Sequence, residues 1–339
     1  MTSLNIDGTL RLLIEKECVY VKAQMIYHPS LESAVIGTML KQATDSEGNP
    51  LDVTFTEGDR NNLISQIDET APILIIAGMV ITDKEDYAIT EYLNSFGNVP
   101  FVDFYVIGSL VKVGHIAGVT IIRPYAEGVS TISMVYDAFL ESRSMLRLAK
   151  EKDLDVLVDL VTQYYLYNFR DNTTYYLSLG LLHMYNALGM NLYKYTKDIK
   201  EQGDLLQSEL FKDLMTTGFA KQENYVQRQA TTVKWEMVLY NGEYITLGVV
   251  NGHTYKNELA HYLMKFSNTP KTIIVVLEEK NGTAMTIRTN GVNAVSVAKL
   301  VHEGADGKAS ATTVYTKLHN TTLDVANAFK NAIEGGATL

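Results

Sequence analysis

Short apolar segments that alternate with single helical segments dominate the first part of this chain. We expect strands where apolar and β-branched residues gather, at residues 19–27, 51–56, 73–76, 101–107 and 120–122. The segments between them that have helical composition are residues 31–41, 61–68 and 84–96, and Ser30 is well placed to cap the first helix. Because strands joined by single helices favour right-handed crossovers, the pattern predicts a parallel sheet with helices on both faces.

A parallel sheet of this kind binds ligands at the carboxyl ends of its strands. In this chain those ends fall at residues 27–33, 77–79 and 104–109. A catalyst with this fold would therefore carry its functional side chains in these three segments.

The second half of the chain reads as a helical region followed by a smaller domain. Residues 133–219 are largely helical in composition, and a polar helical segment follows at 221–228, so we place a boundary near Lys221 and expect domains 1–220 and 221–339. In the second domain, Asn241 and Gly242 form a typical two-residue turn between strands. The expected elements there are strands 232–240, 244–250, 272–277 and 285–288, helices 255–265, 295–301 and 323–333, and a small-residue loop at 304–312. The sequence thus predicts an α/β protein with two lobes.

Charge and cysteine content argue against several classes of function. The net charge of −10 disfavours non-specific binding to duplex DNA, which needs clustered basic residues. The single cysteine, Cys18, cannot form an internal disulfide and is typical of a reducing compartment. Since the sequence contains neither a long apolar run nor a secretion signal, we expect no membrane association and a cytoplasmic location.

Three segments, YHPSLES at residues 27–33, residues 126–136 and residues 286–312, occur in the same order as segments that they resemble in the DHH phosphoesterase superfamily, in particular in its oligoribonuclease branch. The family's first strand ends in a segment like SHNDLDG, and residues 27–33 here read YHPSLES. Residues 126–136 resemble its segment of glycine, small hydroxyl residues and valine-tyrosine, and residues 286–312 resemble the strand, helix and glycine loop of its C-terminal domain. The resemblance covers nearly the whole chain. It implies a two-lobed fold and two-metal hydrolysis of short oligonucleotides, cyclic dinucleotides or pyrophosphate.

The residues at the family's metal-binding positions differ from the family pattern. Ser30, Glu32, Gly78 and Tyr165 stand where the resemblance implies aspartates, and the aspartate-histidine-histidine triplet is absent. His28 and Glu32 are the remaining candidate ligands. A two-metal centre needs several converging carboxylates and imidazoles, so we expect no catalytic residues, no metal and no cofactor unless other side chains rebuild the site. The side chains considered for such a site are Asp83, Asp86, Asp103 and His115.

The loop at residues 304–312 is a candidate site for an anion. The family's loop reads GGGH and its histidine falls on Gly307 here, whereas the arginine of the preceding strand is kept as Arg288. Small residues allow backbone amides to approach a phosphate, and basic side chains supply charge. The candidate ligand-binding residues are therefore Arg288, Gly304, Gly307, Lys308 and Ser310. The alternative is a tight connection that only packs two strands.

Three functions remain open from the sequence. The first is a catalytically inactive relative of the DHH phosphoesterases that acts as a binding or assembly component, a role that would suit a virus-encoded or accessory subunit. The acidic, tyrosine-rich composition favours a protein partner or self-association over a nucleotide or short oligonucleotide. The second is a phosphodiesterase that uses Mn²⁺ or Mg²⁺ to cleave short oligonucleotides or cyclic dinucleotides. The third is a nucleotide-binding regulatory module. A cleft between the lobes would be the natural ligand site.

Overall fold

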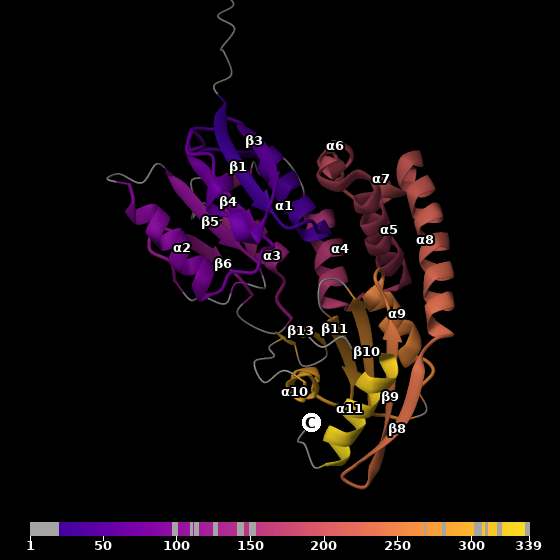
Figure 1. The fold of residues 1–339 in the computed structure, drawn as a ribbon. Coiled ribbons are helices and arrows are strands. Elements are labelled where there is room, and N and C mark those ends of the chain that lie inside the picture. Colours follow the sequence, from indigo (N-terminus) through magenta and orange to yellow (C-terminus); the bar gives the residue numbers. More distant parts are fainter. Residues whose placement is uncertain are drawn as a thin grey trace, which may run out of the picture. The chain divides into compact units, whose positions relative to one another are not determined.

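The chain divides into two compact units, Met1–Thr216 and Thr217–Leu339. The computed structural model, drawn in Figure 1, describes residues 20–96, 101–108, 111, 115–124, 128–140, 146–148, 154–267, 269–279, 283–301, 307–308, 311–316 and 321–335. Each unit contains its own sheet, so the predicted α/β class with an N-terminal parallel sheet and a smaller mixed α/β unit is confirmed. Among the described residues, no helix has the length and apolar character needed to cross a membrane.

The first unit is built on a five-stranded sheet in the order β3-β1-β4-β5-β6, with parallel pairing throughout. Every residue of β4 is buried, which explains its uninterrupted apolar sequence. The strands are β1 (Val21–Tyr27), β3 (Leu51–Glu57), β4 (Ile73–Ala77), β5 (Asp103–Ile107) and β6 (Thr120–Ile122).

Helices cover both faces of this sheet. On one face, Leu74 and Ile76 of β4 belong to the same buried cluster as Ile89 of α2 (Asp83–Asn94). On the other face, the ring of Tyr105 in β5 lies 6.3 Å from that of Phe139 in α3, measured between ring centroids. Helix α1 spans Leu31–Gln42, and the helices that pack against it include α3 (Thr131–Leu140), α4 (Asp155–Leu166) and α5 (Asn172–Leu188). As expected, Ser30 caps α1, because its side chain accepts a hydrogen bond from the amide of Ser33.

The predicted helix at residues 61–68 is wrong, because two short 3₁₀ helices, η1 (Arg60–Asn62) and η2 (Ile64–Gln66), occupy this segment. The carboxylate of Asp59 accepts hydrogen bonds from the backbone amide of Asn61 and from the side chain of Asn62. Side-chain bonds of this kind compete with the backbone bonds of an α-helix. The local polar residues therefore favour a capped turn.

The other elements of the first unit are shorter and lie mostly in its helical part. An antiparallel pair, β2 (Ala43–Thr44) with β7 (Arg147–Leu148), was not expected from the sequence. The helices that follow α5 are η3 (Gly189–Leu192), α6 (Tyr193–Thr196), α7 (Gln202–Gln207) and α8 (Glu209–Ala230). The division between Thr216 and Thr217 falls within α8, as does the position near Lys221 at which we placed the boundary.

The second unit contains a six-stranded mixed sheet in the order β12-β13-β11-β10-β9-β8. Neighbouring strands are antiparallel except β9 and β10, which are parallel. The turn between β8 and β9 has positive φ at both Asn241 (+49°) and Gly242 (+81°), as the predicted two-residue turn requires. The strands are β8 (Lys234–Tyr240), β9 (Glu243–Asn251), β10 (Thr272–Glu279), β11 (Thr283–Asn290), β12 (Gly307–Lys308) and β13 (Ala311–Thr316). The helices are α9 (Lys256–Met264), α10 (Ala294–Lys299) and α11 (Thr322–Glu334).

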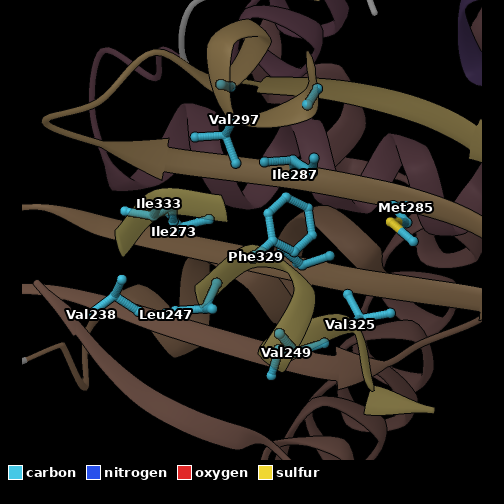
Figure 2. Close-up of a cluster of buried hydrophobic side chains, with 14 of the residues drawn as sticks. Val238, Leu247, Val249, Ile273, Met285, Ile287, Val297, Val325, Phe329 and Ile333 are labelled. Atoms are coloured by element: carbon cyan, nitrogen blue, oxygen red, sulfur yellow. The ribbon is translucent and has the colours of Figure 1, made fainter. Parts of the chain in front are cut away.

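Two buried clusters lie on opposite faces of this sheet. On one face, Figure 2 shows the ring of Phe329 from α11 among side chains of the central strands, including Ile273 and Ile287. On the other face, Ile274 and Val276 of β10 pack against α9 and against Val226 of α8. Residues 273–276 belong alternately to the two clusters, as expected for a strand whose two faces are both buried.

The prediction of a loop across residues 304–312 is wrong for the part that the structure describes. Gly307 and Lys308 form β12, and Ala311 and Thr312 begin β13, with Gly307 paired to Thr312 and Lys308 to Ala311. The small residues favour a loop, whereas the threonines and Val314 that follow have high β propensity. Gly304 and Ser310 lie outside the described residues.

Candidate functional site

Backbone hydrogen bonds continue the first sheet past the carboxyl ends of its strands. The amide of His28, after β1, donates to the carbonyl of Ala77 at 2.9 Å. The amide of Gly78, after β4, donates to the carbonyl of Ile107 at 2.8 Å. The amide of Gly108, after β5, donates to the carbonyl of Ile122 in β6 at 3.0 Å. These strand ends are therefore held side by side at the edge where parallel sheets bind ligands. We call this region the carboxyl edge.

Two glycines of the carboxyl edge lie very close to their neighbours. Gly78 has a φ of +70°, in the left-handed region that favours glycine. A Cβ atom at this position would lie 2.9 Å from the Oγ of Ser33, a fully buried residue of α1. A Cβ atom at Gly108 would lie 3.4 Å from the Cα of Gly78. Residue 78 could therefore carry a carboxylate only if Ser33 moved.

The side chain of Tyr165, in α4, lies against the start of α1. Its hydroxyl accepts a hydrogen bond of 3.1 Å from the backbone amide of Glu32 and also hydrogen-bonds the side chain of Ser30. Burial, and then the charge of Glu32, raise the pKa of the Tyr165 phenol. Tyr165 is thus protonated at neutral pH, and it contacts both Ser30, the cap of α1, and Glu32, the two residues there that the resemblance places at metal-ligand positions.

Two more tyrosines with raised pKa values lie near the end of β1. Burial, followed by the influence of Tyr27 and the charge of Glu57, raises the pKa of Tyr185 in α5 to about 12. Burial and the charge of Glu57 also raise the pKa of Tyr27 itself. Mn²⁺ and Mg²⁺ prefer anionic oxygen ligands. Protonated phenols at these positions supply hydrogen bonds and no negative charge.

The described side chains of the carboxyl edge do not fit the metal pair that the resemblance implies. His28 is exposed in the turn after β1, and Glu32 is half-buried in the first turn of α1. Nowhere among the described residues do three or more His, Cys, Asp or Glu side chains gather in a way that could hold a metal ion. Two candidate ligands are too few for two cations.

The four side chains considered as replacement ligands do not form such a group. Asp103 is the first residue of β5, so it lies at the amino edge of the parallel sheet, away from the carboxyl edge. Asp83 and Asp86 lie in the first turn of α2, where negative charge is favourable to the helix. His115 directly precedes the bridge between Ile116 and Val119.

The second unit holds the candidate anion-binding residues. The guanidinium of Arg288, which is half-buried in β11, donates a hydrogen bond of 2.7 Å to the Oδ1 of Asn257 in α9. The strand register places Ala311 opposite Arg288, and Lys308 opposite Ala311. The backbones of Arg288 and Lys308 therefore share one row across the sheet, with Gly307 next to Lys308. The loop residues Gly304 and Ser310 lie outside the described part of the chain, so the complete site remains a prediction.

The charge of Arg288 also acts on a histidine of α9. Burial, and then the charges of Lys265 and Arg288, lower the pKa of His261 in α9. Lys256, at the start of α9, forms an ion pair of 2.5 Å with Glu278 of β10.

The comparisons with known proteins bear on the fold. No protein-family model and no curated protein sequence matches the chain. A solved structure described as the DHH domain of a member of the s1p family of ribosomal proteins is similar over 94% of this chain and 88% of its own, with a TM-score of 0.55 and 12% identity. The chain has the fold of the DHH phosphoesterases.

Two further structures with the DHH fold match over almost their full length. One is PggH of Vibrio cholerae, a pGpG-specific phosphodiesterase, at 13% identity and a TM-score of 0.50, covering 92% of this chain and 99% of that one. The other is an exopolyphosphatase-related protein of Bacteroides fragilis, at 12% identity and a TM-score of 0.50, covering 94% and 93%. The resemblance inferred from the order of segments is thus confirmed for the fold.

The contact of Tyr165 with α1 is the feature of the site that the sequence did not reveal. The two partners, Glu32 and Tyr165, are 133 residues apart in the chain. The resemblance aligned position 165 with a ligand aspartate, but no local pattern indicates that a phenol would reach the first turn of α1.

Proposed function

We propose that this protein is a binding or assembly component that has the DHH fold and does not hydrolyse phosphoesters. The observation that carries the proposal is the packing of the carboxyl edge. Gly78 and Tyr165 stand at positions where the resemblance implies carboxylates, and both are tightly fitted against α1. Two-metal hydrolysis needs several anionic groups around its cations, and a glycine and a protonated phenol provide none.

The test is a turnover assay on pGpG and short oligoribonucleotides with Mn²⁺ or Mg²⁺, together with a calorimetric titration of Mn²⁺. We choose pGpG because one structure with this fold is a pGpG-specific phosphodiesterase. We expect no product above that of the metal ions alone, and no tight Mn²⁺ binding. Product that is lost in Glu32→Gln and in His28→Ala, but kept in Asp213→Asn, would overturn the proposal in favour of a metal-dependent phosphodiesterase. Asp213 is a suitable control because it is an exposed carboxylate of α8.

An exposed apolar patch on the β8–β9 hairpin supports the assembly part of the proposal. Leu239 lies opposite Tyr244, and Met237 is two residues along β8, so the three side chains share one face. Their exposed fractions are 46% for Met237, 46% for Leu239 and 59% for Tyr244. Contiguous exposed apolar side chains mark surfaces that bind other proteins.

The assembly is tested by measuring the mass of the protein in solution with light scattering over a range of concentrations. We expect a species larger than the monomer in the wild type, and a monomer in Leu239→Lys. Leu206→Lys is the matched control, because Leu206 of α7 is 45% exposed and outside the patch. A wild type that is monomeric at every concentration would contradict self-association through this hairpin.

A further inference from the structure

A pocket with a volume of about 540 Å³ lies in the second unit, between the last turns of α8 and the loop that precedes α9. Its lining consists of Lys221, Asn224, Tyr225, Arg228, Thr254 and Tyr255. The four residues from α8 have the spacing i, i+3, i+4 and i+7, which places them on one face of the helix. The volume is within the range of sites that bind small molecules.

The phenol of Tyr225 fixes the shape of this pocket. Its hydroxyl accepts hydrogen bonds from the backbone amides of His253 at 2.7 Å and Thr254 at 3.4 Å. The ring of Tyr225 also lies against that of Tyr255, with centroids 5.9 Å apart and an angle of 63° between the planes. Tyr255 has a φ of +48°, an uncommon conformation for a residue with a side chain. The side of the pocket is therefore a preformed aromatic surface.

Two side chains of the lining are positively charged, and the carboxylate that acts on the lining is the buried Glu258, whose charge, after burial, raises the pKa of Tyr255. Lys221 and Arg228 are two helical turns apart, or about 10 Å along the axis, and none of the six lining residues is acidic. Among the described residues, neither Lys221 nor Arg228 has an ion-pair partner, whereas Lys256 and Lys271 of the same unit pair with Glu278 and with a glutamate of β9. The guanidinium of Arg228 instead lies 5.8 Å from the centre of the Tyr225 ring.

This arrangement is unusual in a chain with a net charge of −10. Two basic side chains without carboxylate partners attract an anion, and flat ring faces between them favour a ligand that is itself flat. Thr254 and Asn224 add a hydroxyl and an amide that can hydrogen-bond the polar edge of such a ring. We propose that the pocket binds a small anion attached to a flat aromatic ring, of the kind represented by a nucleoside monophosphate. The proposal is independent of the carboxyl edge and of whether the protein catalyses any reaction.

The fluorescence of Trp235, the single tryptophan of the chain, is the signal by which ligand binding is followed. Trp235 packs against the same buried cluster as Tyr225 and Tyr255, so a ligand in the pocket should change its fluorescence. The probe is adenosine 5′-monophosphate, titrated at low salt. Adenosine has the ring without the anion, and ribose 5-phosphate has the anion without the ring. We expect the monophosphate to bind at least tenfold more tightly than either, and its affinity to fall as salt screens the charges.

Charge variants identify the site. We expect Lys221→Gln and Arg228→Gln each to weaken binding of the monophosphate about tenfold, because each removes one of the two cations. Lys299→Gln, an exposed lysine of α10 outside the pocket, should leave binding unchanged. Tyr225→Phe keeps the ring but removes the acceptor for the two backbone amides, so it should weaken binding while thermal unfolding still reports a folded unit.

Three results would overturn the inference. The first is the absence of any fluorescence change up to millimolar monophosphate. The second is equal binding of ribose 5-phosphate, which would remove the role of the ring. The third is binding that persists in the double variant Lys221→Gln/Arg228→Gln, which would place the ligand elsewhere.

Discussion

The substitution Gly78→Ala tests whether the carboxyl edge is closed to side chains. The left-handed backbone at residue 78 costs an alanine about 1 to 2 kcal/mol relative to glycine. The new Cβ atom would also lie 2.9 Å from the Oγ of Ser33, which is fully buried and accepts a hydrogen bond of 3.0 Å from Ser30. Forcing extra volume into a packed interior costs a further 1 to 3 kcal/mol or so. We therefore expect Gly78→Ala to lower the free energy of unfolding of the first unit by about 2 to 5 kcal/mol.

Gly48→Ala is the matched control. Gly48 has a φ of +86°, yet a Cβ atom there would meet nothing within 4 Å. Its replacement should cost only the backbone contribution of about 1 to 2 kcal/mol. The difference between the two variants isolates the contact with Ser33.

Hydrogen exchange of the β4 amides is the assay, because it reports the first unit without requiring the whole chain to unfold in one step. Each 1.4 kcal/mol corresponds to about a tenfold faster exchange through opening of the unit. We expect the β4 amides of Gly78→Ala to exchange about 5- to 150-fold faster than those of Gly48→Ala. In the background Ser33→Ala, which lacks the Oγ, this excess should largely disappear. Equal exchange in the two glycine variants, or an excess that survives Ser33→Ala, would refute the reasoning.

Three further substitutions test the packing described above. Tyr165→Phe should destabilise the first unit by about 1 to 2 kcal/mol, since the amide of Glu32 loses its acceptor, and exchange of the α1 amides measures this. Burial by itself would raise the pKa of Glu85, but hydrogen bonds from Arg60 and Thr82 lower this pKa to about 2. The ionised carboxylate therefore stabilises the folded state fully above about pH 4.5, and this stabilisation is lost as the pH falls towards 2. Glu85→Gln should therefore remove on the order of 3 kcal/mol at neutral pH and flatten acid unfolding over that window. Phe329→Ala should destabilise the second unit by about 3 to 5 kcal/mol, followed by tryptophan fluorescence in urea.

The elements that the sequence predicts well are those whose signal is local. The apolar run of β4 and the Asn241-Gly242 turn each follow from a few adjacent residues, and the structure confirms both. The prediction failed at residues 61–68, where the side chain of Asp59 competes for backbone amides. It also failed at Gly307 and Lys308, whose strand depends on pairing with a neighbour rather than on their own propensity.

The candidate sites show the same division between local and distant information. The spacing of Lys221, Asn224, Tyr225 and Arg228 is visible in the sequence as one helical face, but nothing in it indicates that the loop around Thr254 closes a pocket over them. The hydrogen bond from His253 to Tyr225, which forms that closure, joins residues 28 apart in the chain. Contacts of this kind arise only when the sheet and its helices are assembled.

The close packing at Gly78 and the hydrogen bonds of Tyr165 both involve the first turn of α1. An aspartate introduced at residue 78 would first have to displace Ser33, and Ser33 is held by the cap of α1. The same cap carries Ser30 and precedes Glu32, whose amide is bound to the phenol of Tyr165. Freeing either position for a cation would therefore leave a buried amide or hydroxyl without its partner, at a cost of about 1 to 3 kcal/mol each. Each such substitution should therefore destabilise the first unit before a cation can bind, which supports the proposal of a binding role.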